Sequence, residues 1–170
     1  WTQKRLRDNK MEKEAVTNSS SLIFLAKINR LDLLKNLFKN IFISKQVTKE
    51  ILDKNKPENN IIKKELNYFI KETEVKELKY LPLDEGECSA ISLCLEKNIK
   101  FFLSDDKRAR NFALSLGIEP IGTLGVLLKN VKNRKIEKEE CKILLNKLLE
   151  LGLYLSNEVY FEVLKLIEEA

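Results

Sequence analysis

The alternation of short apolar runs with longer amphipathic segments is the feature that most constrains how this chain folds. The apolar runs predict strands at 15–18, 40–44, 73–78, 100–103 and 119–121. The segments between and after them predict helices at 20–28, 31–38, 44–53, 61–71, 84–97, 106–116, 123–130, 138–151 and 157–169. This alternation favours an α/β fold, in which a mainly parallel sheet of four to five short strands has helices on both faces.

The length and composition favour a single domain. With 170 residues, of which 44% are hydrophobic and 34% charged, the chain is long enough to bury one core and short for two. We assign residues 14–170 to this domain. Residues 1–13 are polar and basic, and we interpret them as a tail or a cloning remnant.

Composition also excludes several kinds of chemistry. The chain has no histidine, which excludes Ser-His-Asp and Cys-His catalysis and histidine-ligated zinc. Cys88, Cys94 and Cys141 lack zinc-ligand spacing, so we expect buried free thiols in a cytoplasmic protein. No apolar run reaches the ~20 residues of a membrane span. The net charge of +5 fits a polyanionic partner, although no aromatic cluster suggests a platform for stacking bases.

Polar residues stand at the ends of two predicted strands. Asn18 and Ser19 end the first strand, and Ser104, Asp105 and Asp106 follow the strand at 100–103. Ligands of open parallel sheets bind beyond the carboxyl ends of the strands. We therefore expect both polar groups at the same edge of the sheet.

Glu87 and Glu50 each have two interpretations. Asp84 and Glu87 fit a capping box at a helix start. Glu87 also heads the apolar stripe of its helix, and a carboxylate that faces the interior is costly without a partner or a cation. Glu50 borders a buried stripe beside Val47 and Ile51, where it forms either a surface salt bridge or part of a site. The residues alone leave both questions open.

Asp105 and Asp106 are adjacent carboxylates at the start of a predicted helix. Either can cap that helix, where the helix dipole favours negative charge. One aspartate is enough for a cap, and a bound Mg²⁺ or Mn²⁺ would offset the repulsion between two. Lys107, Arg108 and Arg110 follow, and they either meet phosphates or form a solvated basic face.

The segment from Gly122 to Gly125 resembles a phosphate-binding loop only weakly. Its simpler interpretation is a tight turn in which Thr123 caps the following helix.

Five motifs occur in an order that resembles the PIN domain, a metal-dependent ribonuclease fold that includes VapC-like toxins. They are TNSSSLIFLAKINRLDLL (17–34), VTKEIL (47–52), LDEGECSAISLCLE (83–96), FLSDDKRARNFALSLGI (102–118) and IGTLGVLL (121–128). The resemblance covers roughly residues 14–165 and is strongest to a prokaryotic PIN subfamily with an NSSPLI-type start and a DxGExxAI motif.

The resemblance implies a set of site residues. The implied catalytic residues are Asn18, Glu50, Glu87, Asp105 and Asp106, and the implied ligands of Mg²⁺ or Mn²⁺ are Asn18, Glu87, Asp105 and Asp106. Implied substrate contacts are Ser19, Ser104, Lys107 and Arg108. The chain departs from the family at Asn18, where the family has aspartate, and an amide oxygen supplies neither charge nor a base. We expect Asn18, Glu50, Glu87 and Asp106 to converge in one concave site.

The resemblance also implies a function. We expect a metal-dependent ribonuclease of toxin type that cleaves single-stranded or structured RNA, forms a homodimer and binds a small antitoxin protein. The alternative, which Asn18 favours, is a PIN-fold module that binds RNA or protein without cleaving. In a further alternative, each acid is only a cap or a salt bridge.

Overall fold

The computed structural model describes residues 13–170. The predicted tail lies outside the described residues except for Lys13. Its carbonyl oxygen accepts a 2.8 Å hydrogen bond from the backbone N–H of Lys39, and its ammonium group lies 5.6 Å from the centre of the Phe101 ring. Lys13 is therefore bonded to the folded domain.

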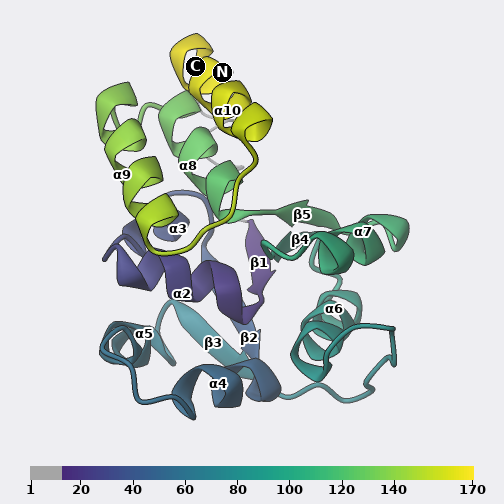
Figure 1. The fold of residues 1–170 in the computed structure, drawn as a ribbon. Helices are drawn as coiled ribbons and strands as arrows, with labels where there is room; N and C mark the ends of the chain where they lie inside the picture. The colour runs from purple at the N-terminus through teal and green to yellow at the C-terminus, as the bar shows by residue number, and fades with distance from the viewer. Residues whose placement is uncertain (1–12) are drawn as a thin grey trace, which may run out of the picture.

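A five-stranded parallel sheet forms the centre of the protein (Figure 1). Its strands are β1 (Glu14–Thr17), β2 (Asn40–Ser44), β3 (Ile70–Thr73), β4 (Phe101–Leu103) and β5 (Glu119–Ile121). They lie in the order β3-β2-β1-β4-β5, and each neighbouring pair is parallel. The direction of strand order reverses between β1 and β4, which is where ligand crevices form in such sheets.

Helices cover both faces of this sheet, which confirms the predicted three-layer α/β fold. They are α2 (Ser19–Lys27), α3 (Asp32–Lys35), α4 (Lys45–Leu52), α5 (Asn59–Glu65), α6 (Glu85–Lys97), α7 (Lys107–Ser115), α8 (Thr123–Lys132), α9 (Lys138–Glu150) and α10 (Asn157–Glu169). In Figure 1, α6 and α7 lie on one side of the sheet and α2, α3 and α8 on the other. The connections up to β3 and those after it run in opposite directions along the sheet, and right-handed connections then place their helices on opposite faces. α8 follows the last strand and so is not part of such a connection.

The segment before β3 differs from the sequence prediction. The helix predicted over 61–71 ends earlier, with α5, and the strand predicted over 73–78 is replaced by β3. Asn67 has a left-handed φ of 67°, and a right-handed helix does not continue through that conformation. Ile70 then pairs with Ile41 of β2 and is fully buried. Strand pairing and burial outweigh the local helical pattern here.

The helix predicted over 31–38 is confirmed only at its centre, as α3. The backbone N–H groups of Leu37 and Phe38 both donate to the Leu34 carbonyl oxygen, at 3.0 and 2.9 Å. This turn ends the helix and leads the chain into β2.

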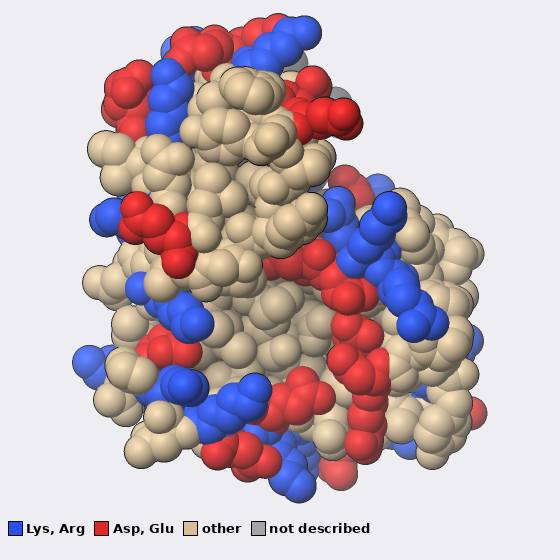
Figure 2. Space-filling view, viewed as in Figure 1, with Lys and Arg blue, Asp and Glu red and all other residues tan. Residues whose placement is uncertain are grey.

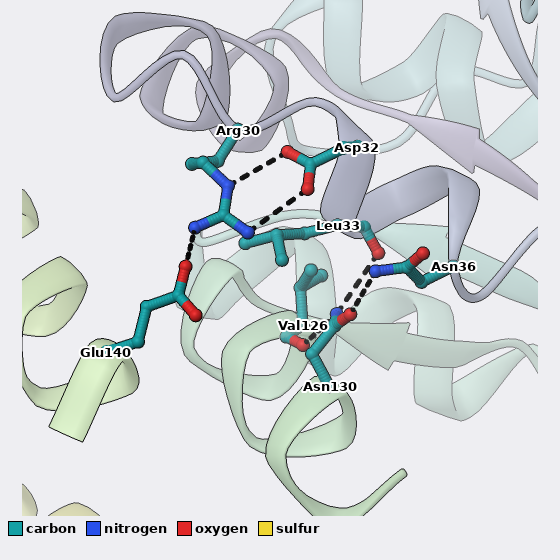
Figure 3. A network of polar contacts seen from close by, with 7 residues as sticks. All are labelled: Arg30, Asp32, Leu33, Asn36, Val126, Asn130 and Glu140. Atoms are coloured by element: carbon teal, nitrogen blue, oxygen red, sulfur yellow. Dashed lines mark hydrogen bonds and ion pairs between the residues drawn. The ribbon is translucent and has the colours of Figure 1, made fainter. Parts of the chain in front are cut away.

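A buried asparagine joins α8 to α3 (Figure 3). Asn130 is fully buried, and its amide nitrogen donates to the carbonyl oxygens of Leu33 at 3.1 Å and Val126 at 2.8 Å. Its amide oxygen accepts a 2.8 Å hydrogen bond from the Asn36 side chain. The buried amide is therefore well satisfied, and it fixes the C-terminal helices against the layer that contains α3.

Arg30 makes a second link between these layers, nearer the surface. Its guanidinium group donates to the Asp32 carboxylate at 3.0 and 3.1 Å and pairs with Glu140 of α9 (Figure 3). Partly exposed ion pairs contribute only about 0–1 kcal/mol, so Asn130 is the stronger of the two links.

The prediction for the cysteines is confirmed, because Cys88, Cys94 and Cys141 are all free and buried. Burial raises the pKa of Cys141 to about 11, so this thiol stays protonated and unreactive at neutral pH. Within residues 13–170, no helix has the length and apolar character needed to span a membrane.

Candidate functional site

The candidate site lies where β1 and β4 end side by side. The backbone N–H of Asn18 donates to the Leu103 carbonyl oxygen at 2.8 Å, which fixes the residue after β1 to the last residue of β4. Asn18 also begins α2, since its side-chain oxygen accepts from the Ser19 N–H at 2.8 Å. The loop with Asp105 and Asp106 starts at this same edge of the sheet.

Glu87 enters the site from the first turn of α6. The predicted capping box is confirmed, because Asp84 accepts from the Glu87 N–H at 2.8 Å and Glu87 accepts from the Asp84 N–H at 3.3 Å. Glu87 is only 8% exposed. Burial, followed by the negative charges of Asp84 and Asp106, raises the pKa of Glu87 to about 7, and Glu50 contributes in the same direction. The Glu87 carboxyl group therefore caps the helix and also belongs to a cluster of acidic side chains that repel one another.

Glu50 reaches the same region from α4. Burial raises its pKa, the charges of Asp84 and Glu85 raise it further, and a hydrogen bond from the Gly86 N–H lowers it. Gly86 permits this approach, because a Cβ atom built there would lie 2.2 Å from Oε1 of Glu50. The Glu50 carboxylate therefore packs against the first turn of α6, which is the turn that carries Glu87.

The two adjacent aspartates have different surroundings. Asp106 is exposed and caps α7 through a 2.8 Å hydrogen bond from a backbone N–H. Asp105 turns toward α8 and accepts 2.7 Å hydrogen bonds from both the N–H and the hydroxyl of Thr123, and a 3.2 Å bond from the Ser21 hydroxyl. The prediction that Thr123 caps α8 is wrong, because Gly122 occupies the cap position and Asp105 binds the Thr123 N–H. Asp105 is thus part of the scaffold, whereas Asp106 faces the acidic cluster.

The two serines expected to contact substrate differ in exposure. Ser104 is fully buried, and its hydroxyl accepts a 3.2 Å hydrogen bond from the Asp106 N–H. This hydroxyl shapes the aspartate loop and has no surface left for substrate. Ser19 is partly exposed and lines a hollow of about 500 Å³ together with Glu50.

The two basic residues expected to contact substrate are exposed on α7. Arg108 donates a 2.7 Å hydrogen bond to the Pro82 carbonyl oxygen, which joins α7 to the loop before α6. Lys107 precedes it in the first turn, directly after Asp106.

Acidic side chains form a band across one face of the protein, with a hollow on one side and a stripe of Lys and Arg on the other (Figure 2). Among residues 13–170, the ion pairs all involve other carboxylates, so Glu50, Asp84, Glu87 and Asp106 have no salt-bridge partner there. These four carboxylates therefore form no ion pair within the part of the chain that the structure describes.

Comparison with known proteins decides the family. A family model described as "DUF3368: PIN domain" matches residues 14–169. The chain belongs to the PIN-domain family. No curated protein matches it.

Two solved structures share the PIN fold with this chain. One is a PilT N-terminus domain protein, SSO1118, from the hyperthermophilic archaeon Sulfolobus solfataricus P2, at 20% identity and a TM-score of 0.55 over 68% of this chain and 92% of that one. The other is the PIN domain endonuclease Utp24, at 9% identity and a TM-score of 0.50 over 64% of this chain and 84% of that one. At these identities the likeness concerns the fold alone.

PIN-domain nucleases generally use divalent metal ions, and the donors of this PIN domain suit one in chemistry and charge. Mg²⁺ and Mn²⁺ prefer carboxylate and carbonyl oxygens, which Glu87, Asp106, Glu50 and Asn18 supply. The pKa of Glu87 is raised by burial and by neighbouring carboxylates, and a bound cation would stabilise its charged form. As the side chains stand, no three Asp, Glu or Cys residues of the described chain are close enough to hold a metal ion together. Asp106 accepts a hydrogen bond from the Ala109 N–H and Glu50 from the Gly86 N–H, so both carboxylates are held apart by the starts of α7 and α6.

Sequence reasoning missed Gly86 as a site residue. A signal was present, because glycine inside a helix costs about 1 kcal/mol relative to alanine. A glycine in the first turn of α6 therefore indicates a close approach by another group, which here is the Glu50 carboxylate.

Proposed function

We propose that this PIN domain is a metal-dependent ribonuclease that hydrolyses phosphodiester bonds in RNA. The observation that carries the proposal is the buried carboxyl group of Glu87 inside an acidic cluster. Burial, followed by the negative charges of Asp84 and Asp106 and a smaller contribution from Glu50, raises the pKa of Glu87 to about 7. Such perturbed groups cluster at functional sites more often than elsewhere.

Each site residue has a role in the proposal. Glu87, Asp106 and the Asn18 amide oxygen would hold Mg²⁺ or Mn²⁺, and Asp105 would position the loop that carries Asp106. When bound, the ion supplies positive charge at a phosphoryl oxygen and makes a hydroxide nucleophile accessible near neutral pH. Glu50, whose pKa is raised by burial, would accept a proton from the attacking water.

Basic residues outside the acidic cluster would hold the RNA backbone. Lys107 and Arg108 lie exposed on α7 beside Asp106, where they can neutralise phosphates on either side of the scissile bond. Affinity for RNA should then fall steeply as salt is added.

The biological setting belongs to the same proposal. We place the protein among toxin-type PIN domains, as a cytoplasmic homodimer inhibited by a small antitoxin protein. The three free, buried cysteines are compatible with a reducing compartment.

Cleavage of mixed-sequence RNA tests the proposal. Wild-type protein should cleave with Mn²⁺ or Mg²⁺ and lose activity in EDTA. Glu87→Gln keeps the capping-box geometry and Asp106→Asn keeps a cap acceptor, so both should fold normally and lose cleavage. Glu162→Gln, on the exposed side of α10, is the matched control and should cleave as the wild type does.

The second candidate function is a PIN-fold module that binds RNA without cleaving it. Asn18 favours it, because the residue after β1 supplies no charge to the site. RNA binding that persists with every metal tested, without cleavage, would select this function and exclude the nuclease.

A further inference from the structure

We propose that a second hollow, beside the acidic cluster, binds one nucleotide of the RNA next to the scissile phosphate. The inference rests on the proposed RNA-binding function and extends the site beyond the substrate contacts that the family resemblance implies. Its three principal residues are Arg110 of α7, Lys129 of α8 and Tyr154 of the connection between α9 and α10.

The hollow lies between α7, the start of α8 and the α9–α10 connection, and its volume is about 360 Å³. That volume is at the small end of the roughly 300–1,000 Å³ range of small-ligand pockets, which suits a single nucleotide better than a longer segment. Asp105 forms part of its wall, so the hollow begins one residue from Asp106. In Figure 2 the acidic band, the basic stripe and the neutral surface of the C-terminal helices meet on this face.

Two cations of the lining, Arg110 and Lys129, are free to bind an anion. Arg110 and Lys129 are exposed, and neither has an ion-pair partner within residues 13–170. The two acids of the lining are engaged, Asp105 with Thr123 and Ser21, and Glu119 with Lys100 at 4.0 Å. Arg110 and Lys129 can therefore donate charge-assisted hydrogen bonds to a phosphate, while Asp105 and Glu119 balance the formal charge of the lining.

The same hollow has an aromatic rim. Tyr154 is 87% exposed, and Leu155 and Val159 continue the lining from the same connection and the start of α10. A tyrosine ring beside free cations provides what single-stranded nucleic acids require, a stacking surface for the base and positive charge for the backbone. An apolar peptide would use Leu155 and Val159 and would gain nothing from Arg110 and Lys129. These charges favour a nucleotide.

Sequence reasoning saw no stacking platform because its parts are far apart in the chain. Tyr154 lies in a short connection after α9, whereas Arg110 lies on α7. Only the packing of the C-terminal helices against α8 brings them to one hollow.

Fluorescence anisotropy with a labelled single-stranded RNA, in EDTA so that the RNA stays intact, tests the subsite. Tyr154→Ala should weaken binding about tenfold, since base stacking on an aromatic ring contributes roughly that much, and should leave the salt dependence unchanged. Tyr154→Phe should restore the affinity. Arg110→Gln should weaken binding and lower the slope of log affinity against log salt by about 0.7, the value for one lost phosphate contact on a single strand.

Matched controls are available on the same molecule. Tyr80 is as exposed as Tyr154, at 89%, and Lys165 is an exposed cation on α10. Tyr80→Ala and Lys165→Gln should bind RNA as the wild type does. Equal losses in Tyr80→Ala and Tyr154→Ala would overturn the subsite, as would wild-type affinity in both Tyr154→Ala and Arg110→Gln.

The outcomes separate this inference from the proposed ribonuclease. Binding with the expected variant pattern but without cleavage under any metal would support the subsite and refute the nuclease. Cleavage and binding that ignore Tyr154 and Arg110 would refute the subsite alone. Protein that binds no RNA at all would refute both proposals.

Discussion

Replacement of Glu87 by glutamine should stabilise the metal-free protein while it abolishes cleavage. Glutamine keeps the shape of the side chain and an oxygen that can accept the Asp84 N–H of the capping box. It removes a negative charge that is 8% exposed and repelled by Asp84, Asp106 and Glu50. Residues that are needed for catalysis often lower the stability of the folded protein, so their replacement raises it.

The size of the effect follows from the pKa of Glu87. A carboxyl group whose pKa rises from its usual 4.5 to about 7 in the folded protein costs about 3 kcal/mol above neutral pH, at about 1.4 kcal/mol per pKa unit. Solvent at the edge of the site screens part of this, which leaves about 2 kcal/mol. For a chain of this length, that corresponds to about 4–8 °C in Tm.

The pH dependence has a definite sign. The folded state retains the Glu87 proton between about pH 4.5 and 7, where the unfolded chain has lost it. Wild-type stability should therefore fall as the pH rises through this window, and Glu87→Gln should remove that part of the fall. Its advantage should be near zero at about pH 4.5 and complete at about pH 8.

Urea denaturation at several pH values, with and without Mn²⁺, measures these effects. Mn²⁺ at about 100 times its Kd should stabilise the wild type by about 2.7 kcal/mol and should act much less on Glu87→Gln. Glu162→Gln, which alters an exposed carboxylate of α10, should give no stabilisation. A Glu87→Gln variant that is less stable than the wild type at pH 8 would show that the capping box alone explains this residue.

Three further predictions concern the site and its support. Asn18→Asp restores a charged ligand, so it should bind Mn²⁺ about tenfold more tightly or better in calorimetry and lower the stability of the metal-free protein; unchanged Mn²⁺ affinity would exclude Asn18 from the site. Gly86→Ala places a methyl group 2.2 Å from the Glu50 carboxylate and should reduce cleavage by up to about 100-fold with little change in circular dichroism, whereas full activity would remove Glu50 from the mechanism. Asn130→Ala leaves the Leu33 carbonyl oxygen without its buried donor, and should lower the free energy of unfolding by about 1–3 kcal/mol in urea denaturation. An unchanged free energy of unfolding would show that this amide does not hold α8 in place.

Local patterns predicted most of the elements because their causes are local. The strands β2 and β5 have the predicted bounds, and the Asp84–Glu87 capping box forms as its spacing indicates. A cap needs only residues within one turn, so the sequence contains it completely. β3 was predicted in the wrong place because its position depends on pairing with β2, and the preceding residues carry a helical pattern.

The candidate site was predictable as a set of acids but not as an arrangement. The family motifs indicated Glu50, Glu87 and Asp106. The charges of Asp106 and Glu50 are among those that raise the pKa of Glu87. The motifs also indicated Asp105, which the structure bonds to Thr123 of α8. Adjacent residues at a strand end point in different directions, and the partners that select a direction come from elements far away in the chain.

The sequence by itself determined that this protein is an α/β PIN domain, because strand and helix periods, caps and motif order are written within short segments. Its motif order also indicated which acids to test as metal ligands. The tertiary structure alone decided that Asp105 serves the scaffold, that Gly86 admits Glu50 to the site, and that Tyr154 shares a hollow with Arg110. These outcomes depend on contacts between segments that meet only after the sheet and its helices have packed, and no local pattern records such contacts.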